Sequence, residues 1–211
     1  MNKIVNQAKR GWILKINGEV VPVVEHLCLV NSRFGELEYG LTPGGWDAWQ
    51  FHENGGGGSV IIPYAKISGQ LFVGLVHQSR PNQGGDVWNI PRGFLQFGET
   101  HFGTAQSELE QEVGYRSLEL RLLEGKPMNA NSAFFVTQND EGVRVYALEV
   151  HDNEIIDGGT NGWSFNPKVL RPISKSAELI FGCRFFPWRQ ATEVGDMFTL
   201  AAIARLQAAL E

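Results

Sequence analysis

Cysteine is scarce in this sequence of 211 residues: only Cys28 and Cys183 occur, far apart and with no Cys-x-x-Cys pair. Their spacing excludes a disulfide framework and a sulfur-based zinc site, and it suits a reducing compartment. The N-terminus is interspersed with charge and lacks the apolar core of a signal peptide. The longest apolar stretches, such as 71–76, are far too short to span a bilayer. We therefore expect a cytoplasmic protein that has no membrane partner.

Basic charge is also in short supply, since 18 basic residues face 23 acidic ones and the net charge is −5. A mildly acidic chain has no general attraction to nucleic acid, so we expect no nucleic-acid partner. A phosphorylated substrate would need a metal ion or local arginines to offset charge repulsion. The glycine-rich stretch 54–59 (NGGGGS) has no Lys-Ser/Thr after it, which excludes a P-loop. We interpret it as a flexible loop between strands; an engineered linker or another phosphate-cradling loop is the alternative.

Strand and helix patterns alternate along the chain. A Ser68-Gly69 hairpin turn joins two of the expected strands, and residues 78–89, rich in Pro, Asn and Gly, are expected to form a loop. Such an order predicts an α/β protein with a mixed sheet. Strands are expected at 20–24, 26–30, 60–67, 71–77, 118–123, 133–137 and 143–150, and helices at 103–113 and 197–210.

The central helix carries two carboxylates on one side. Glu108 and Glu112 are four residues apart, and Gln111 lies on the same side, whereas Phe102, Ala105, Leu109 and Val113 form an apolar side. Thr100 is suited to cap the start of the helix and Gly114 to end it. On spacing alone a solvated face is the commoner explanation of such a pair, and a metal site is the alternative.

The longer pattern from Gly93 to Tyr115 resembles the Nudix box, a 23-residue signature with long and rigid spacing. The flanking segments 76–81, 88–93 and 195–202 resemble ADP-ribose pyrophosphatases of that family. The resemblance implies a Nudix-type α/β/α sandwich, with 1–211 as a single domain: N-terminal strands or an extension over 1–55, and the core with its C-terminal helix over 56–211. The residues on family positions are Gly93, Glu99, Glu108, Leu109, Glu112, Gly114 and Tyr115.

The resemblance also implies roles for single residues. Glu112 would bind Mg²⁺ or Mn²⁺, with Gln111 and the backbone carbonyl of Arg92 as further ligands. Glu108 would be a ligand or the base that activates water, and Glu99 an additional or outer ligand. Two positions depart from the family: Ser107 replaces an arginine that supports the glutamates, and Gln111 replaces a glutamate. The site therefore has one negative charge fewer than the family pattern.

Several residues outside the helix are candidates for binding a ligand. Arg80 and Arg92 flank the loop before the box, where guanidinium groups can clamp a diphosphate, or else form surface or structural ion pairs. Trp88 is a candidate for stacking on a base, although packing is the commoner role of tryptophan. Weaker candidates are Trp46 and Trp49 for stacking, Glu141 as a late acidic ligand, and His77 and His101, for which ordinary structural roles are favoured.

The resemblance implies a Mg²⁺- or Mn²⁺-dependent hydrolase of a nucleoside diphosphate derivative such as ADP-ribose or a nucleotide sugar. The alternative is a Nudix-fold binding or regulatory module without catalysis, for which Ser107 and Gln111 are the argument. An unrelated α/β protein with a chance match is the third reading. The C-terminal helix either packs on the core or forms part of a homodimer interface.

Overall fold

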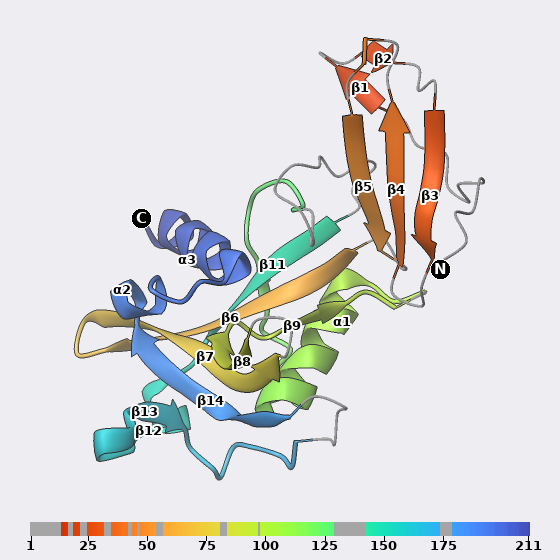
Figure 1. Ribbon diagram of the computed structural model, residues 1–211. Coiled ribbons are helices and arrows are strands. Elements are labelled where there is room, and N and C mark those ends of the chain that lie inside the picture. Colours follow the sequence, from red (N-terminus) through yellow and green to blue (C-terminus); the bar gives the residue numbers. More distant parts are fainter. Residues whose placement is uncertain are drawn as a thin grey trace.

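The computed structural model describes residues 14–16, 19–21, 25–31, 35–41, 44–45, 47–53, 57–80, 84–96, 98–128, 142–173 and 179–211. A mixed sheet of nine strands forms the centre of the molecule (Figure 1). The path through it runs β10 (Arg121–Leu122), β11 (Gly142–Glu149), β6 (Gly57–Ile67), β7 (Gln70–Arg80), β14 (Ile180–Pro187), β13 (Trp163–Phe165) and β12 (Ile155–Asp157). Off this path, β8 (Gly85–Asn89) pairs with β7 and β9 (Arg92–Phe94) pairs with β6.

Among the described strands of the main sheet, one pair is parallel. β11 runs parallel to β6 over its whole length, and the other pairings are antiparallel. The β6–β7 hairpin turns at Ser68 and Gly69, whose φ angles of 51° and 79° are both positive. Two positive φ angles are typical of the type I′ turn, whose twist matches that of the strands it joins. The sequence prediction of a hairpin here is confirmed.

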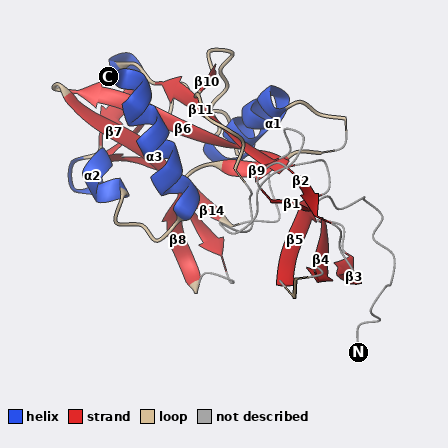
Figure 2. Cartoon of the chain, turned by 90° about the horizontal axis from the view of Figure 1, so that it is seen from above, coloured by secondary structure: helices blue, strands red, loops and turns tan. Residues whose placement is uncertain are grey.

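Helices cover both faces of the main sheet, as Figures 1 and 2 show together. On one face, α1 (His101–Glu108) and the π-helical turn η2 (Leu109–Val113) bury Ala105, Leu109 and Val113 against the sheet. On the other face, α2 (Trp188–Ala191) and α3 (Met197–Leu210) do the same with Ile203 and Leu206. Because successive side chains of a strand point to opposite faces of the sheet, each face has its own apolar core. The predicted α/β/α arrangement is confirmed. The 3₁₀ turns η3 (Asp152–Glu154) and η4 (Gly159–Asn161) lie in the connections.

The N-terminal strands form separate sheets. β3 (Glu25–Asn31), β4 (Gly35–Leu41) and β5 (Asp47–Glu53) make an antiparallel three-stranded sheet, and β1 (Leu14–Ile16) pairs with β2 (Glu19–Val21). Neither sheet shares a paired strand with the main sheet among the described residues. In the described part of the chain, no helix has the length and apolarity needed to cross a membrane.

Some sequence predictions about elements were wrong. Within 78–89, residues 78–80 continue β7 and residues 85–89 form β8, which pairs with it. The buried start of β6 consists of Gly57, Gly58 and Ser59. A Cβ on Gly58 would have no space beside the carbonyl of Gly93. Backbone pairing at these positions outweighs the loop preference of Gly, Asn and Pro.

The limits of other elements also differ. The expected strand 118–123 is reduced to β10, and Phe102 on the supposed apolar side of α1 is 36% exposed. β4, β5 and β14 were not expected. The expected strand 133–137 lies outside the described residues.

Candidate active site

The helix that carries the glutamates begins and ends where its sequence predicts. The Thr100 hydroxyl accepts a hydrogen bond from the backbone N–H of Gly103 at 3.1 Å. Gly114 ends the helix with a φ of 77°. A Cβ on Gly114 would lie 2.5 Å from the carbonyl oxygen of Arg171, so glycine is required there by both conformation and space.

The last part of this helix widens into a π-helical turn at η2, which the sequence did not predict. In a π turn the hydrogen bonds span five residues, so residues four apart remain neighbours while residues three apart separate. Glu108 and Glu112 therefore stay on one side, and Gln111 turns away from Glu108. Such π turns occur frequently at functional sites.

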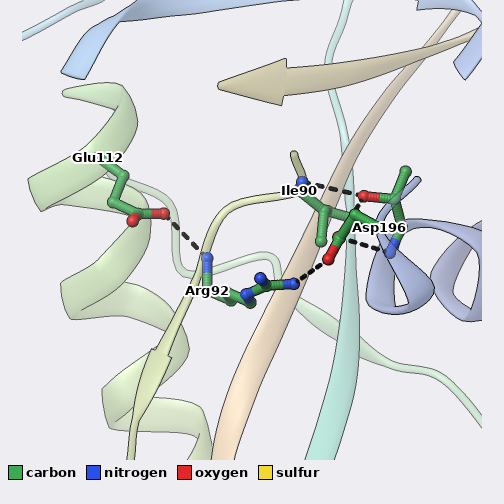
Figure 3. Close-up of polar contacts among 5 residues, drawn as sticks. Ile90, Arg92, Glu112 and Asp196 are labelled. Carbon is green, nitrogen blue, oxygen red and sulfur yellow. Dashed lines mark hydrogen bonds and ion pairs between the residues drawn. The ribbon is translucent and has the colours of Figure 1, made fainter. Parts of the chain in front are cut away.

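Glu112 is 3% exposed and is anchored to Arg92, the first residue of β9. One of its carboxylate oxygens, Oε2, accepts a hydrogen bond of 2.9 Å from the backbone N–H of Arg92 (Figure 3). Burial of the Cys183 thiol on β14 raises its pKa, and the negative charge of Glu112 raises it further. Glu112 is thus a buried carboxylate that a backbone hydrogen bond holds against Arg92.

Glu108 reaches the same loop one residue further along. A Cβ built on Gly93 would lie 1.9 Å from Oε1 of Glu108, so the carboxylate rests directly against the backbone of Gly93. No other residue type leaves this space. The glycine that opens the box pattern therefore lets Glu108 approach the loop, and both carboxylates meet the chain at Arg92 and Gly93.

The Arg92 side chain points away from Glu112, towards α3 (Figure 3). Its Nη1 donates to Oδ1 of Asp196 at 2.6 Å, and the guanidinium lies 4.8 Å from the centre of the Phe198 ring. Asp196 also caps α3, because its Oδ2 accepts from the backbone N–H and the hydroxyl of Thr199. The backbone N–H of Ile90 in turn donates to the Thr199 hydroxyl at 3.1 Å.

This network fixes the loop 90–92 from both sides: Glu112 holds its backbone on one side, and the start of α3 holds it on the other. Sequence reasoning missed Asp196 and Thr199, which lie about a hundred residues away along the chain. The only local signal was an Asp directly before an apolar helix, which predicts a cap and not an ion pair.

The remaining metal candidates lie at different places on the same helix. Gln111 is partly exposed within η2, and Ser107 is partly buried on α1. Glu99 lies before the first turn, where it accepts a hydrogen bond of 3.0 Å from the Thr104 hydroxyl. Glu99 precedes α1, and seven residues at a rise of roughly 1.5 Å each separate the helix start at His101 from Glu108. The described contacts thus bring Glu108 and Glu112 together at the loop, but not Glu99.

Trp88 and Arg80, both candidates for binding a ligand, lie on opposite faces of the sheet. Trp88 stands opposite His77 in the β7–β8 pairing, and their rings stack with centres 4.6 Å apart. The Trp88 ring belongs to the core on the α3 side and also contacts Phe186 and Arg184. Arg80, by contrast, lies four residues after Val76 on β7 and therefore on the same face, the α1 side, where it is partly buried.

The weaker candidates either make structural contacts or lie outside the described residues. His101 donates through Nδ1 to the carbonyl oxygen of Gly58 at 2.9 Å and so ties α1 to β6. Burial, the largest cause, and the nearby charge of Arg144 lower the pKa of His101, against the opposing effect of the Gly58 hydrogen bond. Trp46 and Glu141 lie outside the described residues, and Trp49 is described only as part of β5.

The comparisons with known proteins identify the family of the chain. The sequence profile of the NUDIX domain matches residues 59–195, which is more than half of the chain. The chain therefore belongs to the Nudix family, whose members hydrolyse nucleotide derivatives and generally use divalent metal ions. A search of curated proteins finds no match.

Solved structures are similar to this chain at low sequence identity, and the first of them shares its fold. A crystal structure described as an ADP compounds hydrolase has 12% identity and a TM-score of 0.56, covering 90% of this chain and 94% of its own. A NUDIX hydrolase from Listeria monocytogenes has 16% identity and a TM-score of 0.49, covering 73% and 93%. The NUDIX domain of Shewanella oneidensis NrtR, solved with ADP ribose, has 14% identity and a TM-score of 0.47, covering 73% and 87%.

Proposed function

We propose that this protein is a Mg²⁺- or Mn²⁺-dependent hydrolase that cleaves the diphosphate bond of a nucleoside diphosphate derivative such as ADP-ribose or a nucleotide sugar. The observation that carries the proposal is the meeting of the Glu108 and Glu112 carboxylates at the Arg92–Gly93 backbone. ADP-linked compounds are the first substrates to test because of the box resemblance and the ADP compounds hydrolase that shares the fold.

The donor set fits a hard divalent cation. Mg²⁺ prefers oxygen ligands, keeps several waters, and usually takes only one or two carboxylates together with substrate phosphates. No group of three or more His, Cys, Asp or Glu gathers at one point among the described residues, and a two-carboxylate site needs none. We assign Glu112 and Glu108 as the main ligands and the Arg92 carbonyl as a neutral ligand, whereas Gln111 as a neutral ligand and Glu99 as an outer one remain predictions from the sequence.

A bound cation would neutralise phosphate charge and lower the pKa of the attacking water. The chain's own residues prepare that chemistry. The Arg92 N–H orients the Glu112 carboxylate, and Gly93 gives Glu108 room at the same loop, where it would also accept the proton of the water. Arg80 is the proposed phosphate contact, since its guanidinium can make two parallel hydrogen bonds to phosphate oxygens.

Substitution of Glu112 tests the proposal. With Mg²⁺ or Mn²⁺ present, the wild-type protein should release AMP from ADP-ribose, and Glu112→Gln should abolish that release. Glu110→Gln is the matched control, because Glu110 lies in the same turn but its carboxylate faces Arg171 at the surface. Equal activity of the Glu112 variant and the control would contradict the proposed metal site.

A non-catalytic nucleotide-binding or regulatory module is the second candidate. It is favoured by Ser107 and Gln111, because serine lacks the guanidinium that supports the glutamates and glutamine lacks a charge. Tight binding of nucleoside diphosphates without turnover across a panel of derivatives would establish it in place of the hydrolase. Ligand stacking on Trp88, a homodimer and a cytoplasmic location remain predictions from the sequence.

A further inference from the structure

Two side-chain amides in the main sheet are completely buried and unsatisfied. Gln78 on β7 and Asn89 on β8 are each 0% exposed. All four of their amide N and O atoms lack a hydrogen-bond partner within the part of the chain that the structure describes. Buried polar groups are hydrogen-bonded in the great majority of folded proteins, so two such side chains together need an explanation.

The two amides are neighbours on one face of the sheet. In the β7–β8 pairing, Asn89 stands opposite Val76, and Gln78 stands opposite Val87. Gln78 and Asn89 are therefore diagonal neighbours, within reach of each other's surroundings. The four unsatisfied atoms form one polar patch between the two strands.

The patch lies on the same face as the glutamates. Val76 packs in the core formed with α1 and η2. Cys183 stands opposite Val76 on β14, and burial together with the nearby Glu112 raises the pKa of its thiol. Asn89 also directly precedes the loop 90–92, whose backbone holds Glu112. The amide patch thus adjoins the proposed diphosphate site and is not used by it.

Its chemistry points to an uncharged partner. Each amide offers a donor and an acceptor side by side in one plane, which is the pattern that a planar base edge pairs with, as Asn and Gln do with adenine. A phosphate group presents acceptors only and is better bound by arginine. Both side chains are 0% exposed, so hydrogen bonds to a ligand would be formed without further loss of solvent-accessible surface at the amides.

We propose that Gln78 and Asn89 form a subsite that reads the edge of the ligand's nucleobase. The proposal rests on the proposed function in one respect, namely that the ligand is a nucleoside diphosphate. Because both amides are covered, a side chain must move when the base enters. Arg80, two residues beyond Gln78 on the same face, is long enough to do so when it turns to a phosphate.

The test compares binding with stability. Asn89→Leu and Gln78→Met keep similar side-chain volumes but remove the amides, and Gln106→Met is the control, because the Gln106 amide has a partner in the carbonyl oxygen of Ser117. Calorimetry with Mg²⁺ would measure the Kd of α,β-methylene-ADP, ribose 5-diphosphate and methylenebisphosphonate for each protein. Thermal unfolding without ligand would give each Tm.

We expect Asn89→Leu and Gln78→Met to have a Tm equal to or above that of the wild type, since unsatisfied groups are removed. Their Kd for α,β-methylene-ADP should rise about tenfold, the equivalent of roughly one net hydrogen bond. Their Kd for the two ligands without a base should stay within about twofold, a difference too small for a lost hydrogen bond. Gln106→Met should show the opposite: a lower Tm and unchanged binding.

Other outcomes overturn the assignment. A raised Tm with unchanged binding of α,β-methylene-ADP means that the amides do not contact the ligand. An equal loss of affinity for ribose 5-diphosphate or methylenebisphosphonate means that the amides do not recognise the base. If neither variant folds, the wild type decides: it must bind α,β-methylene-ADP at least about tenfold more tightly than ribose 5-diphosphate. Binding of none of the three ligands would refute the proposed function itself, whereas the outcomes above refute only the base-reading subsite.

Discussion

Gly93 is the residue against which the Glu108 carboxylate rests. We expect Gly93→Ala to displace Glu108, because the added methyl would lie 1.9 Å from its Oε1 and the carboxylate is the more mobile partner. ADP-ribose hydrolysis should fall at least about tenfold, which corresponds to roughly 1.4 kcal/mol in the transition state. Steady-state kinetics with saturating Mg²⁺ would measure the loss.

Gly103→Ala is the matched control for this change, since the nearest atom to its added methyl is the Thr100 hydroxyl at 3.2 Å. It should leave activity unchanged and alter the free energy of unfolding by less than about 1 kcal/mol. Undiminished activity of Gly93→Ala would show that Glu108 is not needed at the loop.

His101 gives the protein a titrating contact between α1 and β6. Its pKa in the folded state lies below the ordinary value of 6.5, mainly because of burial. The unfolded chain therefore binds this proton more readily, so the stabilising contribution is complete above pH 6.5 and is lost as the pH falls through 6.5 towards the folded-state pKa.

His101→Asn removes this titration but keeps a donor for the Gly58 carbonyl. Between pH 7.5 and 5 the wild type should lose more unfolding free energy than the variant does, as measured by urea denaturation at each pH. Parallel pH profiles for the two proteins would contradict the assigned shift.

At the scale of elements, the start of α3 stabilises the loop of the candidate site. Asp196 both caps the helix and pairs with Arg92. Asp196→Ala should lower the free energy of unfolding by about 2–4 kcal/mol, because it removes the cap and leaves a largely buried guanidinium unpaired. Asp196→Asn keeps a capping oxygen and should lose about half as much.

Urea denaturation would give this series, with Asp152→Ala as an exposed control that should change stability by less than about 0.5 kcal/mol. If Asp196→Asn were as destabilised as Asp196→Ala, the ion pair would account for the whole effect and the cap for none of it.

Local signals predicted the site helix well. Thr100, Gly114 and the pair Glu108 and Glu112 follow from short-range rules on capping and helical spacing. The structure confirms both caps, and the two glutamates contact the neighbouring residues Arg92 and Gly93. The π turn, the Arg92–Asp196 pair and the β7–β8 hairpin were not predictable in this way. Each depends on partners that are distant in sequence or on backbone pairing that overrides local preference, as with Asn89, which reads as a loop residue but is buried in a strand.

At the scale of the whole molecule, the two apolar cores of the main sheet contain no residue before β6 among the described positions. The N-terminal sheets share no paired strand with it in the same part of the chain. A protein that lacks residues 1–55 should therefore still fold, because each element that covers the main sheet remains. Circular dichroism and thermal unfolding should show a single cooperative transition with a Tm close to that of the full chain.

Removal of 197–211, which takes away Ile203 and Leu206 from one core, is the contrasting deletion and should abolish that transition. If the shorter protein also lost cooperative unfolding, residues 1–55 would be an integral part of the domain and the division at 55 would be wrong.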